Sequence, residues 1–177
     1  MIIKHSWRKP QPGYYSAEFE PYIKEVPEDD ILTIWPEQLN ATMYFFRQIP
    51  PEKLEYRYKP DKWTIKEILG HLIDTERIFG YRCLCIARGE INNLPTYDDN
   101  EYVRFGSFND REYRHMMREY EIVKKSNYML FESLPHEALY QIGNVGGVQM
   151  AVLAIPYILL GHELHHLEVI KSKYLDD

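Results

Sequence analysis

The sequence predicts an all-α fold, a four-helix bundle with an irregular N-terminal arm. Four segments of about 20–25 residues repeat apolar side chains at steps of three and four, which is the period of an amphipathic helix. Strand-like alternation is scarce, and eight of the eleven prolines lie within the first 60 residues. Four amphipathic helices of this length are typical of a bundle.

The arm is predicted over residues 1–28 and the bundle domain over residues 29–177. A chain of 177 residues fits one ordinary domain. Chain termini are often poorly ordered, but aromatic side chains are frequent in this arm, which indicates that it packs against the body. These aromatic residues are Trp7, Tyr14, Tyr15, Phe19 and Tyr22.

The first two helices are expected at about residues 29–48 and 64–89. Pro50 and Pro51 end the first helix, because proline lacks the backbone N–H that a helix needs. Thr64 and Glu67 have the spacing of a capping box, and Gly89 fits a C-terminal stop. The apolar stripes are Ile31, Ile34, Trp35, Leu39, Thr42, Phe46 and Ile49 in the first helix, and Ile65, Ile68, Leu72, Phe79 and Ile86 in the second.

The third helix is expected to begin at the cap-like segment 109–112 and to end at Pro135, and the fourth to cover about residues 151–174. Pro156 either lies in the first turn, where no donor is missed, or kinks the helix. The loop at 94–108 is long enough to be functional. The glycine-containing segment 140–148 is predicted as a second irregular connection.

Charge and composition exclude several functions. The chain has 21 basic and 27 acidic residues, a net charge of −6, which argues against nucleic acid as a partner. The longest apolar run, residues 150–160, is too short to span a membrane. Cys83 and Cys85 are two residues apart on a helix and cannot bridge each other. We therefore expect a cytoplasmic protein that acts on a small molecule.

Three histidines cluster in the sequence GHELHH, as His162, His165 and His166. His162 and His166 are four residues apart, so both lie on one side of the helix. They share the apolar stripe of Ile155 and Leu159, which faces the bundle interior. Each buried neutral imidazole carries a donor and an acceptor that need partners. One metal ion would satisfy both acceptor nitrogens.

The segment 162–166 also matches H-E-x-x-H, in which the glutamate, here Glu163, is the general base of a zinc protease. The extended pattern of that class is absent, and only 11 residues follow His166. A third ligand must therefore come from upstream. His71 is the candidate, although a single histidine on a partly apolar helix is more often an ordinary core or surface residue. Three histidines with an open metal position make a catalytic site.

Other polar residues are candidates for supporting roles. Asp74, one turn after His71, and Glu163 are candidates to accept a ligand's second N–H and fix its tautomer; alternatively, Asp74 forms an ion pair on the helix surface. Asp98 and Asp99 either line the mouth of the site or form a turn. Three further pocket candidates carry no specific signal, Tyr81, Arg82 and Asn127.

Several of these motifs together resemble the DinB/YfiT-like superfamily. The motifs are Asp61-Lys-Trp63-Thr-Ile-Lys-Glu67, Gly70-His71-Leu72-Ile-Asp74 and Gly161-His162-Glu-Leu-His165-His166, with the Leu94-Pro95 loop and the Ser133-Leu134-Pro135 stop. The resemblance extends from about residue 30 to residue 174. It implies an up-down-down-up four-helix bundle, often a homodimer, with a divalent metal held by His71, His162 and His166.

The resemblance also implies an activity. Characterised members of this superfamily include transferases that use a low-molecular-weight thiol such as bacillithiol, and others are described as metal-dependent hydrolases. Our first hypothesis is a thiol S-transferase in which Zn²⁺ or Ni²⁺ deprotonates the thiol. The alternatives are a hydrolase with metal-bound water as nucleophile and Glu163 as base, or a non-catalytic metal- or ligand-binding stress protein.

Overall fold

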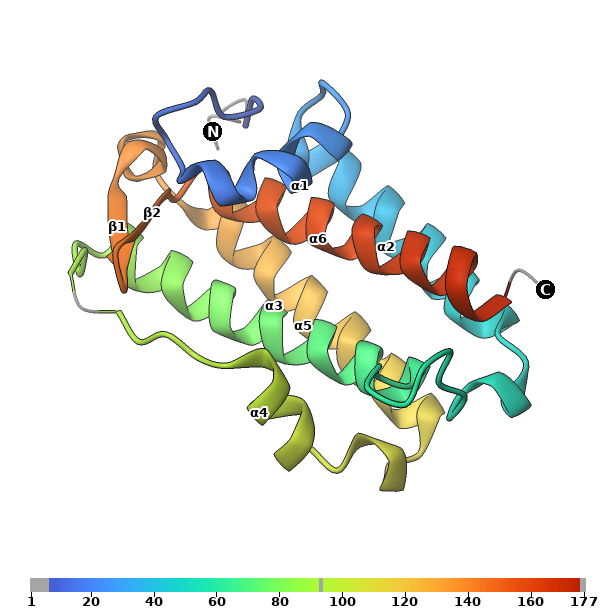
Figure 1. The fold of residues 1–177 in the computed structure, drawn as a ribbon. Helices are drawn as coiled ribbons and strands as arrows, with labels where there is room; N and C mark the ends of the chain where they lie inside the picture. Colours follow the sequence, from blue (N-terminus) through green and yellow to red (C-terminus); the bar gives the residue numbers. More distant parts are fainter. Residues whose placement is uncertain (1–6, 93, 176–177) are drawn as a thin grey trace.

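Four long helices form the bundle in the computed structural model, which describes residues 7–92 and 94–175 (Figure 1). They are α2 (Ile31–Gln48), α3 (Ile65–Ala87), α5 (Tyr113–Ser133) and α6 (Ala154–Ile170). α2 and α6 run in one direction and α3 and α5 in the other, so the predicted up-down-down-up bundle is confirmed. The helices pack in the cyclic order α2, α5, α3, α6.

Local sequence signals set most helix ends as predicted. The capping box of α3 is present, because Thr64 Oγ1 accepts from the Glu67 N–H at 3.1 Å and the Glu67 carboxylate accepts from the Thr64 N–H at 2.7 Å. Gly89 follows α3 with φ of +91°, a conformation that favours glycine. Pro156 lies in the first turn of α6, where it interrupts no hydrogen bond.

The predicted cap of the third helix at Asn109 is wrong. α5 begins at Tyr113, and Asn109 lies in the preceding 3₁₀ turn (Phe108–Asp110). Its amide instead binds the start of α3, because it accepts from the Thr64 hydroxyl at 2.7 Å and donates to Glu67 at 2.9 Å. The long loop before it contains the short helix α4 (Asp99–Phe105), which packs against α3.

The segment predicted as irregular before the fourth helix contains a β-hairpin. β1 (Ile142–Val145) pairs antiparallel with β2 (Val148–Ala151), with Ile142 opposite Ala151. Gly146 and Gly147 form the turn with φ of +59° and +94°. A two-residue hairpin turn of this kind needs positive φ at both positions, which glycine adopts without strain.

The N-terminal arm packs against the bundle, and its first six residues lie outside the described part of the chain. A 3₁₀ turn (Ala17–Phe19) leads into the short helix α1 (Glu20–Glu25), which lies on α6 (Figure 1). Gly161 permits this contact, since a Cβ there would lie 1.9 Å from the Tyr22 carbonyl oxygen. The Tyr157 hydroxyl also donates to the Trp7 carbonyl at 2.5 Å.

A polar layer divides the apolar core of the bundle into two clusters. One cluster includes Trp35, Phe79 and Phe131, and the other includes Phe46, Leu69 and Met116. The buried polar residues between the clusters along α3, α5 and α6 are Glu76, Lys124, Asn127 and Glu163, and the buried Thr42 and His71 adjoin this layer. Within the described residues, no helix combines the length and apolar character that crossing a membrane requires.

Candidate metal centre and adjoining pocket

The structure brings His71, His162 and His166 together at the polar layer. The Nε2 atom of His162 lies 3.0 Å from Nε2 of His71 and 3.1 Å from Nε2 of His166. One nitrogen from each ring lies within 4.8 Å of the others. Two residues on adjacent turns of α6, whose spacing placed them on one side of the helix, therefore meet His71 of α3, the upstream candidate.

The three imidazoles are neutral at pH 7. Burial lowers the pKa of His162 well below 6.5, and the nearby His166 and His71 lower it further. Burial lowers the pKa of His166 to about 3. Burial also lowers the pKa of His71, although the Asp99 carboxylate opposes this effect. A neutral imidazole has a free lone pair, which is the form that binds a metal.

This geometry fits a metal ion. Two imidazoles on one tetrahedral Zn²⁺, each at 2.0–2.1 Å, place their nitrogens about 3.3 Å apart. The two distances from His162 are close to that value, and the nitrogens of His71 and His166 lie within 4.8 Å of each other. Hydrogen bonding alone satisfies the cluster poorly, because the one nitrogen of His162 faces two other ring nitrogens and offers either one proton or one lone pair.

Aromatic side chains enclose the histidine cluster. The Trp63 ring lies 4.8 Å from the His71 ring, centroid to centroid, and is stacked at 6.3 Å on His166. Tyr22 of α1 contacts His162 and His165 edge to face at 5.5 and 5.8 Å. His165 thus flanks the cluster. The aromatic residues of the arm predicted that it packs against the bundle, but the sequence did not indicate that the arm forms a wall of the site.

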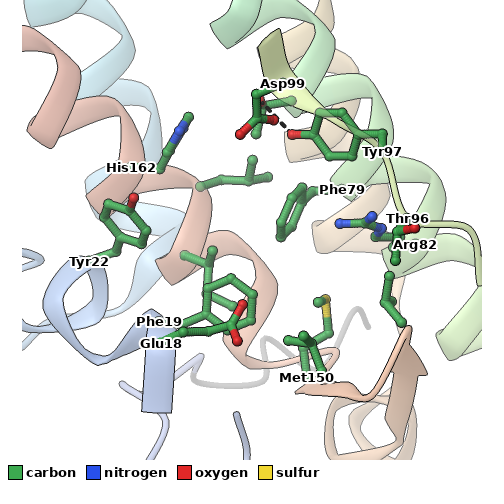
Figure 2. A pocket seen from close by; sticks show the side chains of 15 residues that line it. Glu18, Phe19, Tyr22, Phe79, Arg82, Thr96, Tyr97, Asp99, Met150 and His162 are labelled. Carbon is green, nitrogen blue, oxygen red and sulfur yellow. Dashed lines mark hydrogen bonds between the residues drawn. The ribbon is translucent and has the colours of Figure 1, made fainter. Parts of the chain in front are cut away.

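A pocket of about 290 Å³ adjoins His162 (Figure 2). Its walls come from the arm, α3, the loop before α4, the hairpin and α6. The lining is mixed, with an apolar part, several hydroxyls, two acids and one arginine. The residues are Glu18, Phe19, Tyr22, Thr75, Phe79, Arg82, Thr96, Tyr97, Asp99, Val145, Val148, Met150, Ile158, Leu159 and His162.

The carboxylate beside the ligand rings is Asp99. Its Oδ1 lies 3.9 Å from Nδ1 of His71, and it also lines the pocket. Asp98 caps α4 by accepting from the Glu101 N–H at 3.0 Å. Asp98 therefore has the predicted turn-like role, as a helix cap, and Asp99 has the predicted role at the mouth of the site. Asp74 contacts Arg77 at 3.8 Å on the surface of α3.

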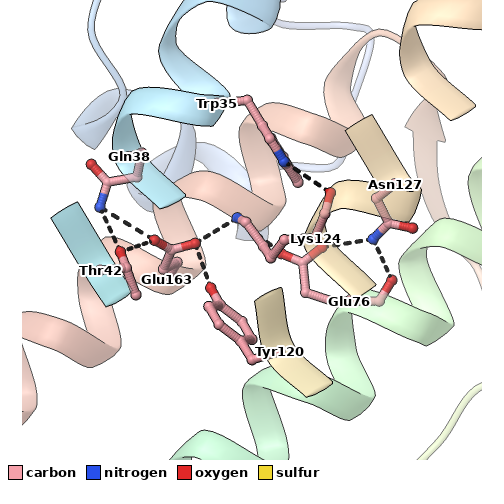
Figure 3. Close-up of polar contacts among 8 residues, drawn as sticks. All are labelled: Trp35, Gln38, Thr42, Glu76, Tyr120, Lys124, Asn127 and Glu163. Atoms are coloured by element: carbon pink, nitrogen blue, oxygen red, sulfur yellow. Dashed lines mark hydrogen bonds and ion pairs between the residues drawn. The ribbon is translucent and has the colours of Figure 1, made fainter. Parts of the chain in front are cut away.

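Glu163 lies in a separate buried network, which we call the lysine network (Figure 3). Its Oε2 accepts from the Tyr120 hydroxyl at 2.6 Å and from Lys124 Nζ at 2.5 Å. Its Oε1 accepts from Thr42 and, at 3.2 Å, from Gln38. Consecutive residues point about 100° apart around a helix, so Glu163 points away from the side of α6 that bears His162.

Lys124 connects Glu163 to a second carboxylate. Its Nζ lies 3.2 Å from Glu76 Oε1 and 3.8 Å from the Trp35 ring centroid. Burial alone lowers the pKa of Lys124, but the two carboxylates outweigh this effect and raise it, so the lysine is charged. Asn127, predicted as a pocket candidate, donates to Glu76 at 2.7 Å.

Only part of the lysine network is signalled in the sequence. Thr42 and Asn127 are polar residues on otherwise apolar stripes, and such positions indicate buried hydrogen bonding. Lys124 and Glu76 carried no such signal, because charged residues on a helix are normally exposed.

Comparisons with known proteins identify both the family and the fold. The family model of the DinB superfamily matches residues 35–170. A solved structure, YfiT from Bacillus subtilis, a probable metal-dependent hydrolase with an unusual four-helix bundle topology, is similar with a TM-score of 0.70 and 14% identity. The similarity covers 93% of this chain and 90% of YfiT. A comparison with curated sequences gave no match.

Proposed function

The chain belongs to the DinB superfamily, and we propose that it is a metal-dependent enzyme that acts on a small molecule. The observation that carries this proposal is the convergence of three neutral imidazoles beside a pocket of about 290 Å³. His71, His162 and His166 would hold the metal, Zn²⁺ or Ni²⁺. The description of YfiT as a probable metal-dependent hydrolase supports the same class of function.

When bound, a divalent metal supplies a Lewis acid that lowers the pKa of a thiol or of water. The protein's own residues prepare the site for this chemistry. Burial keeps the histidines neutral, and Trp63 and Tyr22 limit water around their rings. Beside the site, the Tyr97 and Thr75 hydroxyls lie 3.1 Å apart and offer hydrogen bonds to a substrate.

The finer proposal is thiol S-transfer. A transferase needs the metal ligands and a pocket for the electrophile, but it needs no general base at Glu163. Both oxygens of Glu163 already accept hydrogen bonds within the lysine network. A base must be within hydrogen-bond reach of the proton that it removes, so these contacts argue against a zinc-protease role for Glu163.

Hydrolysis is the second candidate, and Asp99 is the observation that favours it. Its carboxylate is about half exposed, lines the pocket and lies beside His71. In a hydrolase, we propose Asp99 rather than Glu163 as the group that accepts a proton from water.

The test measures metal content first and then turnover with an electrophile panel, with and without an added thiol. We expect close to one metal per chain and thiol-dependent turnover. Thiol-independent hydrolysis that Asp99→Asn abolishes and Asp98→Asn retains would select the hydrolase. Bound metal without turnover under any condition would indicate a binding protein, and protein that binds no metal would overturn the proposal.

Two further expectations remain predictions. The family resemblance implies a homodimer, which sedimentation at several concentrations tests. The cysteine usage predicts a cytoplasmic location, which fractionation of the native cells tests.

A further inference from the structure

Arg82 is a buried cation with an incomplete set of partners. Its side chain lies on the pocket wall, and the residue is only 5% exposed. Nη2 donates to the Pro95 carbonyl at 2.9 Å, and the guanidinium lies 4.8 Å from the Phe79 ring centroid and 5.5 Å from that of Tyr97. The buried Nε has no hydrogen-bond partner among the described residues.

This arrangement is costly without an anion. A buried charge needs pairing, and a buried N–H without an acceptor destabilises the folded protein. Arginine stays protonated in proteins. The Pro95 carbonyl and the two rings offset part of the cost, but they do not supply a negative charge. The Asp99 carboxylate acts on the guanidinium only at a distance, and among the described residues neither Asp99 nor Glu18 forms an ion pair with it; both lie apart from it in Figure 2.

The position of Arg82 relates it to the histidine cluster. His71, Thr75, Phe79 and Arg82 follow one another at steps of four, four and three residues, so they share one face of α3. The span from His71 to Arg82 is about 16 Å along the helix axis. Phe79, Ile158 and Leu159 line the pocket between them. A molecule that reaches both ends is therefore extended, with an apolar middle.

We propose that Arg82 binds the carboxylate of an extended, partly apolar substrate, whose other end reaches the histidine cluster. This inference rests on the proposed function for the identity of the site. A planar carboxylate matches the fork of N–H donors on a guanidinium, and within the described residues only one hydrogen bond, to the Pro95 carbonyl, occupies this fork. Figure 2 shows the guanidinium directed toward the pocket interior beside Phe79.

The test compares an acid with its neutral amide. Phenylbutyrate and phenylbutyramide differ in charge but hardly in shape, and each is titrated into wild type, Arg82→Met and Arg82→Lys by calorimetry. We expect wild type to prefer the acid by about tenfold or more. Arg82→Met should lose this preference, and Arg82→Lys should retain a part of it because it keeps the charge but not the fork. Arg88→Met, an exposed arginine that caps the same helix, is the control.

Each titration is repeated after removal of metal with a chelator, because a carboxylate can also bind a metal. An acid preference that persists in the metal-free protein and depends on Arg82 supports the proposal even if the enzymatic function fails. Equal binding of acid and amide, binding of neither by wild type, or a preference that Arg82→Met retains would overturn it. Circular dichroism and metal content of the variants report whether the fold and the metal site are intact. If Arg82→Met does not fold, the test is whether Arg82→Lys prefers the acid less strongly than wild type does.

Discussion

The histidine cluster and the lysine network occupy the same layer of the bundle, but they differ in how their polar groups are satisfied. In the network, donors and acceptors match, since Tyr120, Lys124, Thr42 and Gln38 donate to the two oxygens of Glu163. In the cluster, His162 Nε2 faces two other ring nitrogens but offers only one proton or one lone pair to them. The hydrogen-bonding groups of the network satisfy one another, whereas those of the cluster are satisfied only when a cation is bound.

This difference shows how a buried polar group that stabilises the fold is distinguished from one that is placed to bind a ligand. His162 and Glu163 are neighbours in sequence and both lie within the bundle, Glu163 buried and His162 partly exposed, so their position on the helix does not separate their roles. Their partners do. The carboxylate faces donors from α2 and α5, while the imidazole faces other imidazoles and a pocket. The following experiments test this contrast.

Lys124→Met should have the largest effect on stability. It removes the only cation that the described contacts place between Glu76 and Glu163, and so leaves two buried carboxylates unpaired. Breaking a buried ion pair in this way costs about 3–5 kcal/mol. Urea denaturation measures the loss. Lys125→Met is the matched control, because its side chain is 63% exposed and should change stability by about 0.5 kcal/mol or less. Equal effects of the two variants would contradict the assigned role of the network.

His166→Ala should leave the fold intact but weaken metal binding more than 100-fold, because loss of a supporting partner alone costs about 10–100-fold. His162→Ala should do the same. His165→Ala is the control, since that ring flanks the cluster against Tyr22 and should reduce affinity far less. Zinc titration with a competing chelator gives the affinities. Unchanged affinity in both ligand variants would remove the metal assignment.

Acidification should destabilise the metal-free protein. The folded pKa values of His71, His162 and His166 are lowered, while the unfolded value is about 6.5. The unfolded state therefore binds more protons below pH 6.5, and stability falls as the pH decreases from 6.5 toward 3. Asp99 weakens this trend at His71.

His162 and His166 are partly exposed, so we expect a loss of only about 1–2 kcal/mol between pH 6.5 and pH 5.5. Denaturation at several pH values measures it, with the His162→Ala variant as control. A variant that keeps the full wild-type slope would show that other groups cause the trend.

Local signals in the sequence predicted most of the fold. Thr64 with Glu67, Gly89 and Pro156 mark helix ends through hydrogen bonds and backbone conformations that adjacent residues determine. The periodicity of the four stripes also predicted which faces point inward. The hairpin was missed because its strands have four residues each, too few for alternation to stand out.

The candidate site was predictable only where one helix supplies the pattern. The spacing of His162 and His166 predicted their meeting, and His71 was a candidate from its place in a motif. Asp99 and Arg82 were candidates without a specific signal, and like Tyr22 they reach the pocket through tertiary packing of the loop, the arm and α3. No short-range pattern records such packing. Lys124 was missed for the same reason, since its partners come from α3 and α6.

Glu163→Gln should have the smallest effect, and it separates the chemistries. The network carries two carboxylates and one lysine, so loss of one negative charge leaves a neutral pair of Lys124 and Glu76. The glutamine amide can face Thr42 and Gln38, whose hydroxyl and amide groups are able to act as acceptors as well as donors. We therefore expect a stability change of about 1 kcal/mol and unchanged metal stoichiometry.

If Glu163 is not the base, thiol-dependent turnover of Glu163→Gln should stay within about tenfold of wild type, whereas loss of a general base lowers the rate about 10²–10⁴-fold. Turnover without thiol that disappears in Glu163→Gln, while the variant still folds and binds metal, would restore the zinc-protease assignment of this residue and defeat the transferase proposal.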